Sequence, residues 1–278
     1  MGFRTVVASN DRALSASEGR VMNVLLGPDM TGATAAQVAA RAKTHESTVV
    51  RLAQKLGYRG YPDLRADLRR DEGVRTSTSI MRGSTGYQLA ALVEDELAAL
   101  RRVTDFVPQD TLDAAARTLH SGSSVYIFSN ADELPVRELM ARRLRRLGMT
   151  VVTMGPDAKD LAEHFVSFGG TSTFVGFALR EAPRQLSTLV GEVGRRGGRS
   201  ILVTDVPGFR FRPTPDHLVA ADRGGDDEYR TQLIPVMLCY ALQLATYHLD
   251  PERYQRARED IDDLTRMLGG ADEIPLRQ

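Results

Sequence analysis

Between residues 123 and 222 the chain alternates short apolar runs with amphipathic stretches, and this alternation constrains the fold more than any other feature. Each run has the length of a buried strand, and each stretch between runs has the apolar spacing of a helix that covers a sheet. Parallel strands need such crossover helices, so the pattern predicts a doubly wound parallel sheet with helices on both faces. The predicted strands are 124–129, 150–154, 173–179, 201–204 and 217–220, and the predicted helices of this part are 136–147, 184–196, 229–248 and 251–268.

The first 70 residues follow another pattern, in which short helical periods are separated by polar turns. Ser15 and Glu18 have the spacing of a capping box, and Gly27-Pro28 ends the helix that they begin. Thr34 is placed to cap a second helix. The further helices predicted in this part cover residues 35–42, 47–56 and 62–70.

A polar segment punctuated by glycine, residues 73–86, separates the two patterns and indicates a linker. We therefore expect an all-helical domain over 1–75, a linker over 76–87, and a second domain over 88–278 that begins with two helices. The expected fold class is α plus α/β, in which the second domain is a flavodoxin-like αβα sandwich. A composition with 42% hydrophobic and 26% charged residues is typical of globular proteins.

The charge of the chain is unevenly distributed, although it sums to zero. Residues 1–75 hold 12 Lys and Arg against 8 Asp and Glu, and residues 41–70 hold eight against three. This surplus favours a polyanion as partner of the first domain, although such a run is often only a solvated face.

The apolar stretch over residues 231–249 bears on the compartment of the protein. It contains two glutamines, a proline and a histidine, which indicates a buried helix and not a membrane span. Its Cys239 is the single cysteine of the chain, so we expect a buried thiol and no disulfide. No apolar leader opens the sequence, and we therefore expect a cytoplasmic protein without membrane contact.

A helix, a short turn and a second helix that begins with hydroxyl and basic residues are typical of a helix-turn-helix, whose second helix enters the major groove of DNA. In this chain the second helix is 47–56, and Arg51 lies where it could contact guanine or a phosphate. The alternative is an ordinary capped helix with a solvated basic face. The candidate DNA-binding residues are Thr44, His45, Ser47, Thr48, Arg51, Lys55 and Arg59.

The amino-acid sequence of this segment resembles that of the DNA-binding domain of RpiR-type bacterial regulators. The resemblance spans about residues 1–75, and its most specific part is Thr48-Val-x-Arg51 followed by Lys55-Leu-Gly-Tyr58-x-Gly-Tyr61-x-x-Leu64. It implies that the segment binds DNA and that Tyr58 and Tyr61 help to pack the helices after the recognition helix. One departure is His45, since relatives commonly carry a serine that caps the helix there.

The same resemblance implies that the second domain is a SIS domain, an α/β fold that binds phosphosugars. Such domains usually have a Gly- and Ser-rich turn after the first strand and a Ser-Gly-x-Thr turn after the third. Here the first turn is Phe128-Ser-Asn-Ala-Asp-Glu133, and the second has Arg180, Glu181 and Pro183 at the serine, glycine and threonine positions. The short hydroxyls that suit a phosphate are therefore absent from the second turn.

Three interpretations of this second turn remain open. Its arginines could bind an anionic group through charge in place of hydroxyls. Alternatively the pocket is lost and the domain only holds a dimer together, or the arginines are surface residues that pair with neighbouring acids. The candidate ligand-binding residues are Ser129, Asn130, Arg180 and Arg184, and the effector would be a phosphosugar or another small anionic metabolite.

Signs of catalysis are weak in the sequence. The five histidines are scattered, no phosphate-binding glycine loop occurs, and the neighbours Glu163 and His164 would point apart on a helix. We expect no catalytic residues, no metal and no cofactor. The sequence predicts a transcriptional regulator that binds double-stranded DNA as a homodimer or higher oligomer and responds to a small metabolite. The alternatives are a sugar-phosphate isomerase with an accessory helical domain, and a regulator whose second domain only dimerises.

Overall fold

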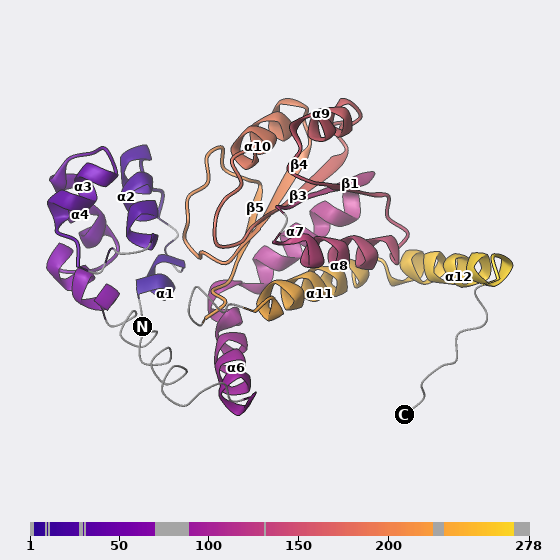
Figure 1. The fold of residues 1–278 in the computed structure, drawn as a ribbon, viewed down its shortest axis with the longest axis horizontal. Coiled ribbons are helices and arrows are strands. Elements are labelled where there is room, and N and C mark those ends of the chain that lie inside the picture. Colours follow the sequence, from indigo (N-terminus) through magenta and orange to yellow (C-terminus); the bar gives the residue numbers. More distant parts are fainter. Residues whose placement is uncertain are drawn as a thin grey trace. The chain divides into compact units, whose positions relative to one another are not determined.

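The computed structural model describes residues 3–8, 10, 12–27, 30, 32–69, 89–130, 132–224 and 231–269 (Figure 1). These residues pack as two compact units. The first comprises the described residues within Met1–Gln109, Ala178–Ala182 and Leu202–Pro235, and the second comprises those within Asp110–Phe177, Pro183–Ile201 and Val236–Gln278. The linker predicted over 76–87 lies outside the described residues.

The N-terminal part is all-helical, as the sequence predicts. Both predicted caps are present, because Ser15 exchanges hydrogen bonds with Glu18, and Thr34 does so with Gln37. The first helix was not predicted, since six residues show too little periodicity to be recognised. The helices are α1 (Phe3–Ala8), α2 (Ala16–Leu26), α3 (Ala35–Arg41), α4 (Glu46–Lys55) and one over residues 61–69.

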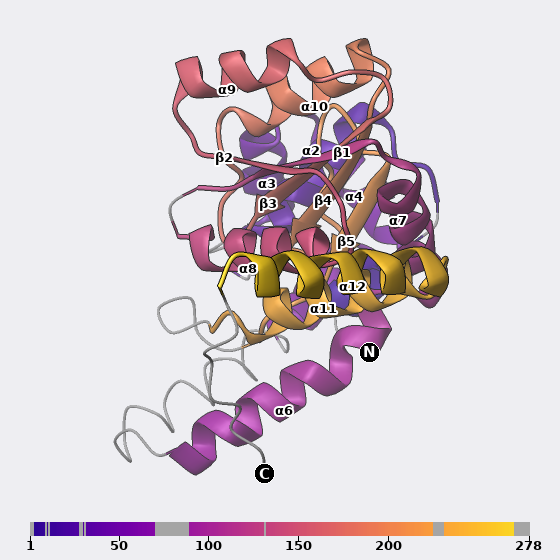
Figure 2. The same ribbon diagram turned by 90° about the vertical axis from the view of Figure 1, so that its right-hand side faces the viewer.

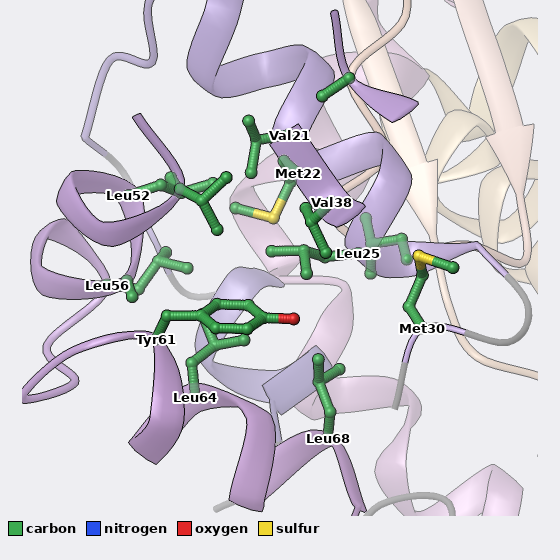
Figure 3. Close-up of a cluster of buried hydrophobic side chains, with 14 of the residues drawn as sticks. Val21, Met22, Leu25, Met30, Val38, Leu52, Leu56, Tyr61, Leu64 and Leu68 are labelled. Carbon is green, nitrogen blue, oxygen red and sulfur yellow. The ribbon is translucent and has the colours of Figure 1, made fainter. Parts of the chain in front are cut away.

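These helices enclose an apolar core to which α4 contributes the fully buried Leu52 (Figure 3), together with Val49 and Ala53, which are also fully buried. Tyr61 belongs to this core, and its buried hydroxyl donates a hydrogen bond of 2.8 Å to the carbonyl of Ala33. Tyr58 packs against the core, and its hydroxyl contacts a carboxylate at 2.7 Å. Both tyrosines therefore have the packing role that the family resemblance implies.

The second domain contains a five-stranded sheet with the order β2-β1-β3-β4-β5. The strand β1 pairs in parallel with both β2 and β3, and every residue of β3 is buried, as expected for a strand inside a doubly wound sheet. The predicted fold class is confirmed, and each predicted strand lies within two residues of an observed one. The strands are β1 (Ser124–Phe128), β2 (Val151–Met154), β3 (Ser172–Ala178), β4 (Arg199–Thr204) and β5 (His217–Ala220).

Helices cover both faces of this sheet, with α9 and α10 on one face and α8 and α11 on the other (Figures 1 and 2). The sequence analysis assigned no helix to the connection between β2 and β3, where α9 lies. Its signal was Asp157, whose carboxylate caps the helix by accepting from two backbone amides. The helices are α6 (Leu89–Phe106), α7 (Gln109–Ser121), α8 (Leu134–Arg145), α9 (Ala158–Val166), α10 (Leu186–Arg195), α11 (Leu233–Tyr247) and α12 (Pro251–Met267).

The apolar stretch near the C-terminus forms α11, as predicted. Cys239 is only 1% exposed, and burial raises the pKa of its thiol to about 12, so the reactive thiolate is nearly absent at neutral pH. Among the helices of the described residues, none combines the length and the apolar character needed to cross a bilayer.

Candidate functional site

The outer face of α4 carries polar side chains that can hydrogen-bond to base edges. Ser47, Arg51 and Gln54 are all exposed, and their spacing of four and three residues places them on one face of the helix. Hydroxyl, guanidinium and amide groups are the ones that read bases in the major groove. The sequence analysis missed Gln54, although its position seven residues after Ser47 was a usable signal.

The first turn of α4 divides into accessible and buried residues. His45 is the N-cap residue and is exposed, and its side chain makes no capping hydrogen bond. Thr48 is 7% exposed and its hydroxyl accepts a hydrogen bond of 3.2 Å from Thr44. The two threonines therefore fix the geometry of the turn, whereas His45 and Ser47 are accessible to a ligand.

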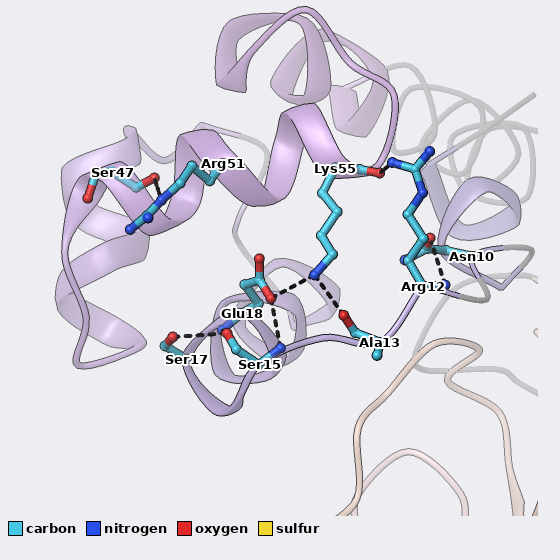
Figure 4. A network of polar contacts seen from close by, with 9 residues as sticks. All are labelled: Asn10, Arg12, Ala13, Ser15, Ser17, Glu18, Ser47, Arg51 and Lys55. Atoms are coloured by element: carbon cyan, nitrogen blue, oxygen red, sulfur yellow. Dashed lines mark hydrogen bonds and ion pairs between the residues drawn. The ribbon is translucent and has the colours of Figure 1, made fainter.

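Arg51 lies beside Ser47, to whose carbonyl its Nε donates a hydrogen bond of 3.3 Å (Figure 4). This contact holds the Nε end of the guanidinium against the helix backbone, while the residue as a whole stays exposed. A guanidinium held in this way is pre-oriented for two parallel hydrogen bonds to a guanine or a phosphate.

The ammonium group of Lys55 is bound to other residues of the protein. Its Nζ donates hydrogen bonds to the carbonyl of Ala13 at 2.7 Å and to Oε2 of Glu18 at 3.0 Å (Figure 4). Burial raises the pKa of Glu18, but hydrogen bonds from Ser15 and the charge of Lys55 outweigh it, so that this pKa lies below its usual value. The ion pair therefore ties the end of α4 to the start of α2.

The other basic candidate, Arg59, is almost fully exposed beyond α4. Its guanidinium lies 3.4 Å from the carboxylate of Asp63, and the Arg59 side chain is 90% exposed. Exposed ion pairs of this kind contribute little to stability, so Arg59 could exchange Asp63 for a phosphate at small cost.

The connection from α3 to α4 contains a strained residue. Lys43 adopts a positive φ of 49°, a conformation that costs a residue other than glycine roughly 1–2 kcal/mol. Arg20 stabilises this turn, since its Nε donates to the carbonyl of Ala42 at 3.0 Å and its Nη2 to that of Lys43 at 3.4 Å. The turn that sets the angle between the two helices is thus held from α2.

In the sheet domain, the candidate ligand residues follow β1 and β3. Ser129 is fully buried, and its Oγ donates a hydrogen bond of 3.0 Å to the carbonyl of the half-buried Asn130. Arg180 and Arg184 are both exposed. In the part of the chain that the structure describes, neither guanidinium takes part in a hydrogen bond or an ion pair.

The backbone at Arg180 is strained in the same way as that at Lys43. Its φ is 65°, and its amide donates a hydrogen bond of 2.9 Å to Oδ1 of Asp205. Within the described residues, Lys43 and Arg180 are the non-glycine positions with positive φ. Such residues concentrate at functional sites, and these two lie in the helix-turn-helix connection and in the turn after β3.

A buried ion pair at the ends of β4 and β5 was not predicted. Asp205 and Arg223 have side chains that are 1% and 2% exposed, and Nε of the arginine lies 2.7 Å from Oδ2 of the aspartate. The signal in the sequence was Asp205, a charged residue placed directly after the apolar strand β4. The described residues hold no cluster of three or more side chains suited to a metal ion.

Comparison with known proteins finds matches for both parts of the chain. Residues 1–72 match the family model of the helix-turn-helix domain, rpiR family. Among curated proteins, no match is found.

Among solved structures, the NanR protein of Vibrio vulnificus in complex with ManNAc-6P is similar, with 16% identity and a TM-score of 0.58, over 96% of this chain and 99% of that one. The sugar isomerase domain of an RpiR transcription factor from Sphaerobacter thermophilus is similar with 15% identity and a TM-score of 0.58, over 64% and 99%. A putative sugar-phosphate isomerase from Listeria monocytogenes has 11% identity and a TM-score of 0.51, over 61% and 97%. At such identities the likenesses show the fold.

A helical domain with a helix-turn-helix, joined to a parallel α/β domain of the sugar-isomerase fold, defines a class of transcription regulator. Within that class, the chain combines a helix-turn-helix domain of the rpiR family over residues 1–72 with a SIS-like domain.

Proposed function

We propose that the chain binds a specific sequence of double-stranded DNA through the outer face of α4. The observation that carries this proposal is the exposed row of Ser47, Arg51 and Gln54 on a helix of the RpiR-type domain. His45 would contact the same groove, and Arg59 would contact a phosphate. Thr44, Thr48 and Lys55, which the sequence analysis counted among the contacts, would instead hold α4 in position.

Replacement of Arg51 by alanine is expected to weaken specific binding by about 1–3 kcal/mol, because a bidentate contact to a base is lost. The measurement is a gel-shift titration on a DNA site selected by the wild-type protein. Arg117→Ala, which removes an exposed arginine from α7, is the matched control and should bind like the wild type. If the Arg51 variant keeps both affinity and sequence preference, the assignment of this residue is wrong.

We also propose that a small anionic metabolite binds where the turns after β1 and β3 leave the sheet. Ligands of open α/β sheets bind at the carboxyl edge where the strand order reverses, which in this sheet is between β1 and β3. Arg180 and Arg184 supply positive charge after β3. A phosphosugar is a candidate because the similar NanR structure contains ManNAc-6P.

A thermal-shift screen of phosphosugars and sugar acids tests the effector proposal. A true ligand at 100 times its dissociation constant should add about 2.7 kcal/mol to the free energy of unfolding. The Arg180→Ala/Arg184→Ala double variant should lose that shift. A shift that survives in the double variant would place the ligand elsewhere, and no shift with any compound would favour a domain that only dimerises.

The proposed regulator is not an enzyme, although the SIS fold also occurs in isomerases. The acid and base candidates Glu163 and His164 lie on α9, where they pair with Lys159 at 4.0 Å and Asp160 at 3.4 Å. These are ordinary contacts between residues one helical turn apart. Turnover of an aldose or ketose phosphate by the purified protein would support the isomerase alternative.

We propose that the active form is a homodimer in the cytoplasm. Leu233, Tyr240 and Leu244 are exposed and share one face of α11, the most apolar of the described helices. A second copy that packs on this face would bury it and present two recognition helices to a pseudo-palindromic site. Sedimentation velocity tests this, since Leu244→Asp should yield a monomer if the face is the interface.

A further inference from the structure

The segment that follows β4, residues 206–212, contacts the N-terminal helices; we call it the β4 loop. Val206 and Phe209 of this loop pack against the apolar core formed by α1 to α4 and the helix over 61–69. The N-terminal helices and residues 202–235 belong to the same compact unit. The loop is therefore part of the packing of the helix-turn-helix domain, although it is an extension of the sheet.

A side chain of α2 clamps the backbone of the β4 loop. Nδ2 of Asn23 donates a hydrogen bond of 2.9 Å to the carbonyl of Arg210, and the amide of Arg210 donates one of 2.7 Å to Oδ1 of Asn23. Because one carboxamide satisfies both backbone groups of a single residue, the contact fixes both the position and the direction of the loop.

The tip of the β4 loop fits closely against α1. The amide of Phe209 donates to the carbonyl of Val206 at 3.1 Å, which closes a turn around Pro207 and Gly208. Gly208 has a φ of 82°, and a Cβ atom there would lie 2.0 Å from Cγ1 of Val7. Only glycine permits this approach, so the close contact is built into the sequence of the turn.

The other end of the β4 loop is anchored in the sheet. Asp205, the residue before the loop, accepts the amide of Arg180 at 2.9 Å and pairs with the buried Arg223. Thr204 donates to the carbonyl of Ala178 at 2.7 Å and accepts the amide of Val206 at 3.3 Å. The ends of β3, β4 and β5 are thus joined by buried and part-buried polar contacts, and the β4 loop leads directly from this junction to α2.

We propose that the β4 loop is the docking surface that orients the helix-turn-helix domain, that Asn23 is its positioning residue, and that Asp205 couples it to the turn at Arg180. This inference deepens the proposed function and rests on it. A ligand that contacts the Arg180 turn would shift Asp205, and with it the loop that holds α2, so that binding at the sheet changes how α4 is presented.

Amide hydrogen exchange of the full chain tests the docking without any DNA or effector. In Asn23→Ala, exchange at residues 206–212 should be at least about tenfold faster than in the wild type, since both clamp hydrogen bonds are lost. In Asn23→Asp, which keeps the acceptor for the Arg210 amide, part of the protection should remain. Gly208→Ala should accelerate exchange by a second route, because the added methyl group collides with Val7.

The link through Asp205 is tested in the same experiment. Asp205→Ala should also accelerate exchange in the β4 loop, since the acceptor of the Arg180 amide and the charge that pairs with Arg223 are both removed. Unchanged exchange in both Asn23→Ala and Gly208→Ala would overturn the docking surface. Unchanged exchange in Asp205→Ala alone would overturn the coupling to the Arg180 turn.

A DNA titration separates failure of this inference from failure of the proposed function. On a selected site with two half-sites, Asn23→Ala should bind about tenfold more weakly, while its affinity for a single half-site should change less than about twofold, because α4 itself is intact. Equal effects on both sites would contradict an orienting role for Asn23. If the wild type itself prefers no sequence, the proposed function fails, and the exchange data still decide the docking.

Discussion

Replacement of Asp205 by leucine is expected to lower the free energy of unfolding by about 3–5 kcal/mol, because a buried charge loses its partner. The side chain of Arg223 is 2% exposed, so water cannot replace the carboxylate that lies 2.6 Å from its Nη2. The amide of Arg180 loses its acceptor in the same change, and with it the hydrogen bond that fixes the strained turn after β3. Urea unfolding followed by circular dichroism measures the loss.

The double variant Asp205→Leu/Arg223→Met is the matched control for this prediction. Since both charges are removed, it should recover most of the stability that the single variant loses. If the single variant is as stable as the wild type, the ion pair does not contribute as its burial implies. If the double variant is as unstable as the single one, the effect comes from packing and not from an unpaired charge.

Truncation of Leu52 to alanine is the second large effect, with an expected cost of about 2–5 kcal/mol. Leu52 is fully buried in the core of the N-terminal helices (Figure 3), whereas its neighbour Arg51 is exposed. The remaining cavity would weaken the packing of α4 against the other N-terminal helices. We expect a lower melting temperature of the N-terminal helices and a loss of DNA binding at temperatures where the wild type still binds.

Gln54→Ala serves as the stability control for Leu52→Ala. Gln54 is exposed on the same helix, so its truncation should change stability by no more than about 0.5 kcal/mol. Thermal unfolding of both variants by circular dichroism provides the comparison. Equal melting temperatures for the Leu52 variant and the wild type would show that the core does not depend on this side chain.

The architecture was predictable because its periodic signals are strong. The strands over 124–128 and 172–178 each begin with one or two hydroxyl residues and then contain only apolar residues and one glycine, and the caps at Ser15 and Thr34 have a spacing that few other structures require. The helix α9 escaped prediction, since its nine residues show little more than two turns of periodicity. No local pattern encodes which strands pair across a sheet, so the order β2-β1-β3-β4-β5 was implied only through the expected flavodoxin-like class.

The candidate site was predictable only in its outline. The spacing of residues in the sequence located α4 and its basic residues. It could not distinguish Arg51, which is exposed, from Lys55, which forms an ion pair with Glu18. That difference depends on contacts between residues 37 positions apart. For the same reason the pairing of Asp205 with Arg223 was invisible. The effector assignments at Ser129, Asn130, Arg180 and Arg184 stay predictions.

Selection from a random duplex library by the intact protein tests the central claim most directly, that α4 reads a specific DNA sequence. We expect the retained duplexes to share one motif, whose affinity exceeds that of unrelated DNA by about 10³ or more and falls steeply with added salt. Retention of duplexes without a common motif, or binding that is indifferent to salt, would contradict the account.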